Sequence, residues 1–167
     1  FNMFIKIFTY HNTINIGAIL QSRTLKDFIE KETSVYTEYH HFQPKKILYA
    51  EYVKPLITKN FYKFKNTIFK NFKIYNWKRK LKNNYSRNLK KKETNNFISI
   101  YGSDEIWNLQ NHYYGYDPHF FGFNNNTKKI SYAASFGKSK LELINKIQRE
   151  ELNKLLGEFE NISVRDE

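Results

Sequence analysis

Polar residues able to do chemistry gather in short clusters that follow predicted strands. The first cluster, HNTINIG at 11–17, precedes a predicted helix, and Asn15 and Gly17 lie in the loop that opens it. Free backbone N–H groups at the positive end of a helix favour a phosphate or a carboxylate. The alternative interpretation is structural, with Asn15 as the helix N-cap and Gly17 easing the turn. The loop is neither a GxGxxG motif nor a Walker loop, which argues against a dinucleotide oxidoreductase and an NTPase.

The second cluster, GSDEIWN at 102–108, comes directly after the apolar run FISIY. Gly102 permits a tight turn there, and Ser103 and Asp104 would present polar atoms at the end of the strand. Asp104 is the candidate catalytic residue, because a carboxylate can accept a proton from a sugar hydroxyl or hold that hydroxyl by a hydrogen bond. In the alternative interpretation, Ser103 or Asp104 caps a short helix.

Trp107 and Asn108 complete the second cluster. The Trp107 ring would offer an apolar face to a sugar ring, and the Asn108 carboxamide would make a bidentate polar contact. The structural alternative places Ile106 and Trp107 in the hydrophobic core instead.

A third cluster, SYAASFG at 131–137, places small residues at a strand-to-helix junction. Ala133, Ala134, Ser135 and Gly137 would let the backbone approach a ligand closely, and Ser135 is the candidate contact. Tight packing between strand and helix explains the same residues equally well.

Arg165 ends the last predicted strand, in the segment NISVRDE. Its guanidinium would clamp a carboxylate or phosphate through two hydrogen bonds, or form an ordinary salt bridge with Asp166 or Glu167. We predict no metal site, because the histidines lack the spacing of metal ligands. The histidines considered are His40, His41, His112 and His119.

Alternating strand and helix patterns predict a doubly wound α/β domain with a mainly parallel sheet. Strands are expected at 2–10, 35–39, 97–101, 129–134 and 161–165, and helices at about 18–31 and 140–156. Because the carboxyl ends of parallel strands share one edge, the polar clusters should line the edge where ligands bind in open α/β sheets. The buried face of the first helix should carry Ala18, Ile19, Ser22, Leu25, Phe28 and Ile29.

The net charge of +12 comes from one segment. Residues 45–92 hold sixteen Lys and Arg and one acid, Glu51, whereas the other residues hold twelve basic and fifteen acidic side chains. Apolar residues there recur at steps of three and four, which predicts amphipathic helices. We therefore expect one domain, 1–167, with a basic helical insertion at 45–92. The apolar stripe consists of Ile57, Phe61, Phe64, Ile68, Phe72 and Tyr75.

The basic segment has three interpretations. The simplest is a surface hairpin whose stripe covers apolar core while its lysines are solvated. A basic amphipathic helix also suits an anionic membrane surface, which makes 57–92 a candidate for peripheral membrane contact. Nucleic-acid binding is the least favoured, because no recognisable RNA-binding or DNA-binding module surrounds the basic residues.

Length and composition fit one compact domain, since 40% of the 167 residues are hydrophobic. The chain has no cysteine, which excludes disulfides and a thiol nucleophile. No run of about 18 apolar residues is present and FNMFIKIFTY does not resemble a signal peptide, so we expect a cytoplasmic protein. Phe1 is not an initiator and Glu167 directly follows a predicted strand, so we expect a fragment of a longer protein.

Five segments in order along the chain resemble the polysaccharide pyruvyl transferase family: HNTINIGAILQ, YGSDEIWN, YDPHFFGF, KKISYAASFG and ISVRDE. They cover most of the chain apart from the basic segment. The resemblance implies the first of two Rossmann-like domains in a GT-B-like arrangement, with the active site between them and the second domain absent from this chain. It also implies transfer of the pyruvyl group of phosphoenolpyruvate, without another cofactor, onto two hydroxyls of a saccharide or a lipid-linked saccharide as a ketal.

The resemblance assigns roles to some residues. Arg165 would be the strongest candidate for binding the anionic groups of the donor, and the loop of Asn15 and Gly17 and the turn at 102–104 would line the cleft. Further donor-binding residues, including a histidine, would lie in the second domain. The chain alone is therefore expected to be inactive.

Two other classes of function stay open from the sequence. A GT-B glycosyltransferase that uses a nucleotide sugar would share this layout, and fold alone cannot separate the two enzymes. A non-catalytic module that binds nucleic acid or acidic surfaces through 45–92 would show an affinity that falls steeply with salt.

Overall fold

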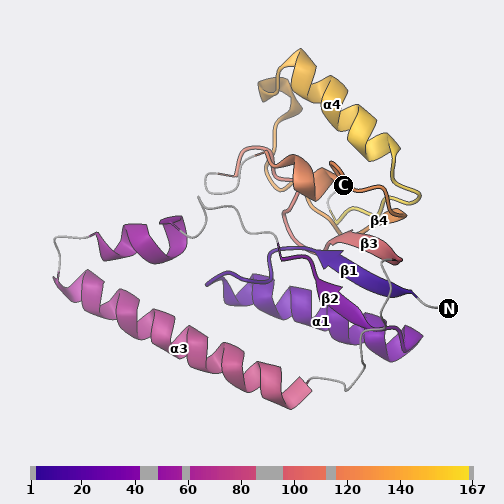
Figure 1. The fold of residues 1–167 in the computed structure, drawn as a ribbon. Coiled ribbons are helices and arrows are strands. Elements are labelled where there is room, and N and C mark those ends of the chain that lie inside the picture. Colours follow the sequence, from indigo (N-terminus) through magenta and orange to yellow (C-terminus); the bar gives the residue numbers. More distant parts are fainter. Residues whose placement is uncertain (1–2, 42–48, 58–60, 86–95, 112–115, 166–167) are drawn as a thin grey trace.

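The computed structural model describes residues 3–41, 49–57, 61–85, 96–111 and 116–165. Within these residues, four strands form one parallel sheet in the order β2-β1-β3-β4 (Figure 1). This sheet and the helices around it confirm the predicted Rossmann-like α/β fold. The strands are β1 (Phe4–Phe8), β2 (Thr37–Tyr39), β3 (Phe97–Gly102) and β4 (Lys129–Tyr132).

The two central strands are apolar on both faces. β1 reads FIKIF and β3 reads FISIYG, the near-continuous apolar pattern of parallel strands covered on both sides. Ile7 of β1 lies in register with Tyr39 of β2 on one side and Ile100 of β3 on the other. Ile7 and Tyr101 are fully buried, so the middle of the sheet is the middle of the core.

Helix α1 (Ile16–Thr33) covers one face of the sheet (Figure 1). Leu25 and Ile29 pack there in one hydrophobic cluster with residues of β1 and β3. The buried face contains five of the six predicted residues, but Phe28 is 56% exposed and Glu30, which was not predicted, is 1% exposed. Phe28 was predicted wrongly because it lies at the border of the apolar stripe, where a side chain can stay outside the core.

The opposite face is covered by a 3₁₀ turn (Pro118–Phe121) and by α4 (Lys146–Gly157) (Figure 1). Leu152 and Leu155 of α4 join the aromatic core on this side. The helix begins later than predicted, because Asn145 forms a capping box with Gln148 and so fixes the first turn. A separate 3₁₀ turn (Leu141–Leu143) precedes it.

The strand predicted at 161–165 is reduced to two isolated parallel bridges, Ile130 with Asn161 and Ala134 with Val164. Between them the Ser131 hydroxyl accepts a hydrogen bond from the Ser163 N–H at 2.8 Å and donates to the Ser163 carbonyl at 2.9 Å. A side chain therefore replaces the backbone partner of a regular ladder, and the prediction of a full strand is wrong.

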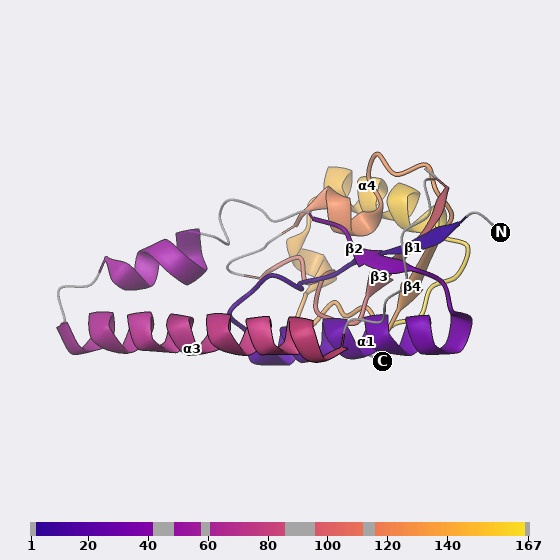
Figure 2. The same cartoon turned by 60° about the horizontal axis from the view of Figure 1, so that its bottom comes forward.

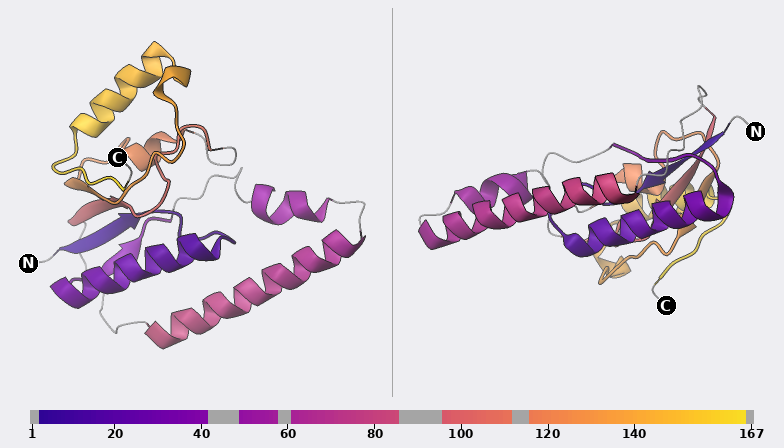
Figure 3. Two further views of the ribbon diagram at one scale, coloured as in Figure 1. Left: turned by 180° about the vertical axis from the view of Figure 1, so that it is seen from behind. Right: turned by 90° about the horizontal axis from the view of Figure 1, so that it is seen from below.

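Helix α3 (Phe61–Tyr85) is a long rod that extends well beyond the sheet (Figures 2 and 3). A π-helical turn (Tyr49–Val53) and a 3₁₀ turn (Lys54–Leu56) lie beside its N-terminal half. The pattern predicted a helix in this stretch. The remainder of 45–92, namely 45–48, 58–60 and 86–92, lies outside the described residues, and its designation as an insertion stays a prediction.

The apolar stripe of α3 does not cover the core in the described structure. Phe61, Phe72 and Tyr75 are 71%, 59% and 63% exposed, whereas Ile74 is only 5% exposed. The packed face of α3 is therefore the neighbouring one, which carries Ile74 and Asn71. The expectation of a stripe turned toward the core is wrong.

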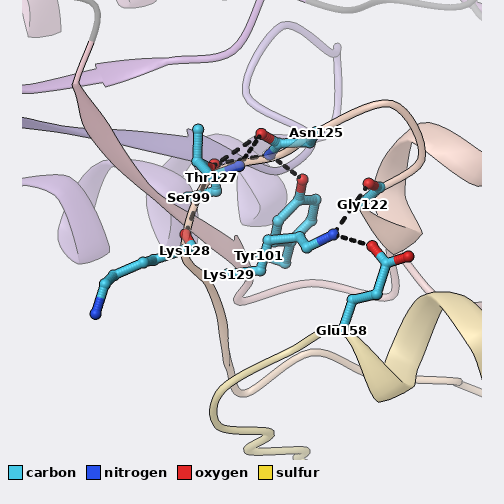
Figure 4. Close-up of polar contacts among 8 residues, drawn as sticks. All are labelled: Ser99, Tyr101, Gly122, Asn125, Thr127, Lys128, Lys129 and Glu158. Carbon is cyan, nitrogen blue, oxygen red and sulfur yellow. Dashed lines mark hydrogen bonds and ion pairs between the residues drawn. The ribbon is translucent and has the colours of Figure 1, made fainter.

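A buried polar network fastens the turn after Phe121 to the sheet (Figure 4). The Asn125 carboxamide donates to the Tyr101 hydroxyl at 2.7 Å and to the Ser99 hydroxyl at 2.8 Å. Thr127 lies 2.7 Å from the Ser99 hydroxyl and donates to the Asn125 carbonyl at 2.9 Å. Burial raises the pKa of Tyr101 far above its ordinary value, so its phenol stays neutral.

Lys129 adds a buried charge beside this network (Figure 4). Its side chain is 4% exposed and forms an ion pair with Glu158, which follows α4. A longer contact of 3.5 Å joins its ammonium to the Gly122 carbonyl. The pair connects β4 to the end of α4 and so fixes the position of the segment that leads to Arg165.

Candidate functional site

Three of the predicted polar segments interlock at the carboxyl edge of the sheet. The Ser103 N–H donates to the Tyr132 carbonyl at 3.2 Å, and the Ser135 N–H donates to the Asp104 carbonyl at 3.0 Å. The Arg165 N–H donates to the Ala134 carbonyl at 3.0 Å. The segments that follow β3 and β4 and the segment 161–165 therefore form one continuous group. We call this group the rim and define it as Gly102, Ser103, Asp104, Ser135 and Arg165.

Gly102 lets the second and third clusters approach each other. Its φ is +124°, a conformation that residues with a side chain rarely adopt. A Cβ atom at this position would lie 2.3 Å from the Tyr132 carbonyl oxygen and 3.1 Å from the Ala134 nitrogen. Only glycine fits between these backbones without a shift of the strand.

Asp104 is the half-buried acid of the rim. Its Oδ1 accepts a hydrogen bond from the Glu105 N–H at 2.8 Å. Burial raises the pKa of Asp104, while this hydrogen bond and the positive charge of Arg165 oppose the rise. A carboxylate with a raised pKa is a stronger base, and Arg165 places an exposed cation close to it. The rim thus combines a carboxylate, a group that can accept a proton, with a guanidinium, a group that can bind an anion.

Ser103 lines a cavity of about 410 Å³. The cavity lies between α1, which supplies Leu20 and Thr24, and the ends of the strands, which supply Ser103 and Tyr132. Within the described residues the buried Ser103 Oγ has no hydrogen-bond partner. The hydroxyl therefore has unused hydrogen-bonding capacity beside this cavity.

Trp107 belongs to the core, as the structural alternative held. It is 1% exposed, its ring stacks against Phe121, and its indole N–H donates to the Phe120 carbonyl at 2.8 Å. Ile106 is buried beside it. The ring therefore has no face to offer to a sugar, and the ligand-binding interpretation of Trp107 is not supported by its position.

Asn108 and Ser135 hold the junction of the second and third clusters together. The Asn108 amide donates to Glu105 Oε2 at 3.0 Å, and its carbonyl oxygen accepts from the Ser139 hydroxyl at 3.1 Å. Ser135 is fully buried, and its hydroxyl accepts a hydrogen bond from the Gly137 N–H at 2.9 Å. Both side chains therefore make internal contacts that position the rim.

Asn15 caps α1 in the structure. Its Oδ1 accepts hydrogen bonds from the N–H groups of Gly17 at 3.0 Å and Ala18 at 3.5 Å. One residue earlier, the Ile14 N–H donates to Glu51 Oε2 at 3.1 Å. The donors expected to receive a ligand anion at this loop are thus engaged by side chains of the protein.

Glu51 is a residue whose role the sequence interpretation missed. It also accepts a hydrogen bond from the Thr13 hydroxyl, so one carboxylate fastens the 49–53 turn to the loop after β1. The sequence offered one clue to this role, because Glu51 is the one acidic residue among the sixteen basic residues of 45–92.

Histidines gather near the ends of β1 and β2. His11 stacks on Tyr39 with ring centroids 4.6 Å apart, and His40 stacks on Phe8 at 4.3 Å. His119 contacts Asp117 at 3.0 Å through Nδ1. No group of three or more His, Asp or Glu arranged to hold a metal ion occurs in the described part of the chain. His112, Asp166 and Glu167 lie outside it.

Asp104 and Arg165 lie at the carboxyl edge of a parallel sheet, the edge where ligands bind in open α/β sheets. A family model for polysaccharide pyruvyl transferase matches residues 15–167, a range that contains the whole rim. The chain belongs to the polysaccharide pyruvyl transferase family and is an enzyme of this kind, acting in polysaccharide biosynthesis. Searches of curated proteins and of solved structures found no match to the chain. None of the helices described here is long and apolar enough to cross a membrane.

Proposed function

We propose that this enzyme transfers the pyruvyl group of phosphoenolpyruvate to two hydroxyls of a saccharide, which it joins as a ketal. The family match supports the reaction class. The observation that carries the proposal for this chain is the placement of Asp104 and Arg165 in one rim at the carboxyl edge of the sheet. That edge is where ligands bind in open α/β sheets.

The reaction requires a cation for the donor and a base for the acceptor, and the rim contains one of each. The donor carries a carboxylate and a phosphate, which a cation binds, and the attacking hydroxyl must lose its proton to a base. A proton adds to the methylene carbon of the donor while the oxygen of a sugar hydroxyl bonds to the adjacent carbon. Cleavage of the C–O bond to phosphate then lets a second hydroxyl oxygen bond to the same carbon. Each hydroxyl gives up its proton, and inorganic phosphate leaves.

Each rim side chain has a proposed role in this scheme. Arg165 binds an anionic group of the donor, for which its exposed guanidinium is suited. Asp104 accepts the proton of the attacking hydroxyl, a role that its raised pKa favours. Ser103, which lines the cavity beside α1, holds a sugar hydroxyl through its own unpaired hydroxyl group.

A donor screen tests the proposed reaction. The full-length enzyme is incubated with saccharide acceptors and either phosphoenolpyruvate or nucleotide sugars. Phosphate release that depends on both phosphoenolpyruvate and an acceptor is the expected result. Release of a nucleoside diphosphate from a nucleotide sugar, without turnover of phosphoenolpyruvate, would instead identify a glycosyltransferase.

Substitution of Asp104 tests its role as the base. Asp104→Asn keeps the shape of the side chain and should lower kcat by roughly 10²–10⁴-fold, the usual contribution of a general base. Asp27→Asn is the matched control, because Asp27 pairs with Arg23 on the surface of α1 and does not line the cavity beside Ser103. An Asp104→Asn enzyme that retained its kcat would remove Asp104 from the mechanism.

We also propose that α3 brings the enzyme to the inner face of the cell membrane, where lipid-linked saccharides are made. The exposed apolar stripe at Phe61 and Phe72, on a helix rich in lysine, supports this contact. The enzyme should sediment with vesicles that contain phosphatidylglycerol but not with vesicles of phosphatidylcholine alone. A Phe61→Ser, Phe72→Ser double variant should lose this binding. Phe123→Ser is the control, since Phe123 is exposed but lies outside α3, after the 3₁₀ turn at Pro118–Phe121. Vesicle binding unaffected by the double variant would refute the contact.

A further inference from the structure

A second cavity lies against the loop after β1. Its volume is about 430 Å³, and three segments of the chain line it: the loop itself, the 49–53 turn and residues 71–79 of α3. We call it the α3 cavity. Because β1 lies beside β3 in a parallel sheet, the loop that lines this cavity and the rim both follow the carboxyl edge of the sheet. The side chains that matter for its chemistry are Asn12, Tyr52, Asn71, Tyr75, Lys78 and Arg79.

Two neighbouring cationic side chains, Lys78 and Arg79, line the α3 cavity. Burial lowers the pKa of Lys78, an effect that the charge of Glu51 partly offsets. The Lys78 ammonium contacts Asn12 Oδ1 at 3.4 Å, a long hydrogen bond. The Glu51 carboxylate is hydrogen-bonded to Thr13 and to the backbone of the loop. Lys78 is thus partly removed from water without a short ion pair in the described structure, and Arg79 adds an exposed guanidinium at the same wall.

The rest of the wall suits a sugar better than a bare anion. Tyr52 and Tyr75 contribute aromatic surface, on which the C–H groups of a sugar ring can pack. Asn12 and Asn71 contribute carboxamides, and the buried Asn71 Oδ1 has no hydrogen-bond partner among the described residues. A sugar hydroxyl would satisfy it by donating a hydrogen bond. Apolar walls with a few placed polar groups are typical of ligand sites.

We propose that the α3 cavity binds an anionic saccharide, with Lys78 and Arg79 on its phosphate or carboxylate group and the tyrosines and asparagines on its ring. If the proposed function holds, this ligand is the acceptor, anchored by its charge at the end of β1 while its hydroxyls extend toward the neighbouring rim. The binding itself does not depend on the reaction.

The proposal is tested by calorimetric titration of the full-length protein. The probes are the 1-phosphates of glucose, galactose and N-acetylglucosamine, glucuronate, neutral glucose, inorganic phosphate and phosphoenolpyruvate. At least one sugar phosphate or glucuronate should bind at least about tenfold more tightly than both glucose and inorganic phosphate, a difference of about 1.4 kcal/mol. The sugar phosphates and glucuronate distinguish the two sources of the negative charge.

Two variants on the same helix make the test specific. Lys78→Gln should weaken the binding of the anionic sugar at least about tenfold. Lys73→Gln should not change it, because the Lys73 ammonium lies 4.8 Å from the centre of the Phe69 ring, outside the cavity. Both variants alter one lysine of α3, so an effect of Lys78→Gln alone cannot come from a general loss of helix charge.

Several results would overturn the proposal. They are no binding by any anionic sugar, equal binding by inorganic phosphate, or unchanged affinity in Lys78→Gln. Weakened binding of phosphoenolpyruvate in Lys78→Gln would make the cavity a donor site and would also overturn it. Failure of the proposed reaction has a different signature: sugar binding would still depend on Lys78, but no phosphate would be released from phosphoenolpyruvate.

Discussion

Substitution of Gly102 by alanine is the sharpest test of how the rim is built. Gly102 ends β3 with φ +124° and lies directly against the backbone of β4. The added methyl group would sit 2.3 Å from the Tyr132 carbonyl oxygen, which is far inside van der Waals contact. Because the obstacle is backbone, no side-chain rotation can relieve the overlap.

The expected loss of stability follows from two terms. An alanine in this backbone conformation costs about 1–3 kcal/mol in local strain. Displacement of β4 by the methyl group adds an overpacking cost of about 1–3 kcal/mol. The free energy of unfolding should therefore fall by roughly 2–6 kcal/mol, and since each kcal/mol moves the Tm of a chain of this size by about 2–4 °C, Tm should fall by at least about 4 °C.

Thermal unfolding monitored by circular dichroism measures this change. Gly157→Ala is the matched control, because Gly157 ends α4 and a Cβ there meets no atom within 4 Å. Alanine in a helix is favoured over glycine by roughly 0.5–1 kcal/mol, so the Tm of this variant should be unchanged or slightly raised. A Gly102→Ala protein that melted within about 1 °C of the wild type would refute the close approach of β3 and β4 at the rim.

Three further changes probe elements that position the site. Glu158→Gln removes the counter-charge of the buried Lys129 ammonium; breaking a buried pair costs about 3–5 kcal/mol, and because Glu158 is 46% exposed we expect about 1–3 kcal/mol in urea unfolding. Asn15→Ala removes the cap of α1 and should cost about 1 kcal/mol in the same assay. Burial lowers the pKa of His40 to about 4, and its unfolded value is near 6.5, so the unfolded chain binds the extra proton and stability should fall as pH drops from about 6.5 to about 4.

Each of these predictions has its own control. Glu150→Gln breaks an exposed pair with Lys146 and should cost less than about 1 kcal/mol, so an equal loss in both glutamine variants would contradict the buried-pair argument. Asn153→Ala, on exposed α4 surface, should not destabilise, which separates capping from a general asparagine effect. His40→Phe should flatten the acid limb of the stability profile; an unchanged limb would exclude His40 as its source.

The strands and α1 were predictable because their information is local. FIKIF and FISIYG have the near-continuous apolar pattern of buried parallel strands, and Asn15 is a strong N-cap that starts α1 where its apolar period begins. The last strand was not predictable. Its pairing is interrupted by the Ser131 hydroxyl, a contact between residues about thirty positions apart that leaves no trace in the alternation of NISVR.

The face on which α3 docks was also beyond the local pattern. Hydrophobic periodicity identified the stripe through Phe72, but α3 packs through Ile74 and Asn71 instead. The nearby 49–53 turn is held to the loop after β1 by Glu51, which is a tertiary contact. The face that α3 turns inward therefore lies near the Glu51 contact and is not the most apolar arc of the helix.

The candidate site divides in the same way. The order of strand ends predicted that the second and third clusters and Arg165 would meet, because parallel strands must end at one edge. Which side chains can reach a ligand depended on burial, which the sequence does not show. Trp107 looked suited to a sugar, but its ring completes a core of Phe121 and Phe136, and an aromatic side chain next to a buried strand more often fills the core.

Two residues of the basic segment, 45–92, contact the loop after β1 at the edge of the sheet. Glu51 holds one side of the loop after β1 through Thr13 and Ile14, and Lys78 contacts the same loop at Asn12. The two residues are opposite in sign and bracket a loop of the sheet edge. A solvated charge run would not require such paired contacts. Loss of the Glu51 hydrogen bonds to Thr13 and Ile14 should therefore disturb both the α3 cavity and the start of α1. This connects the basic segment with ligand binding at the edge of the sheet and not only with solubility.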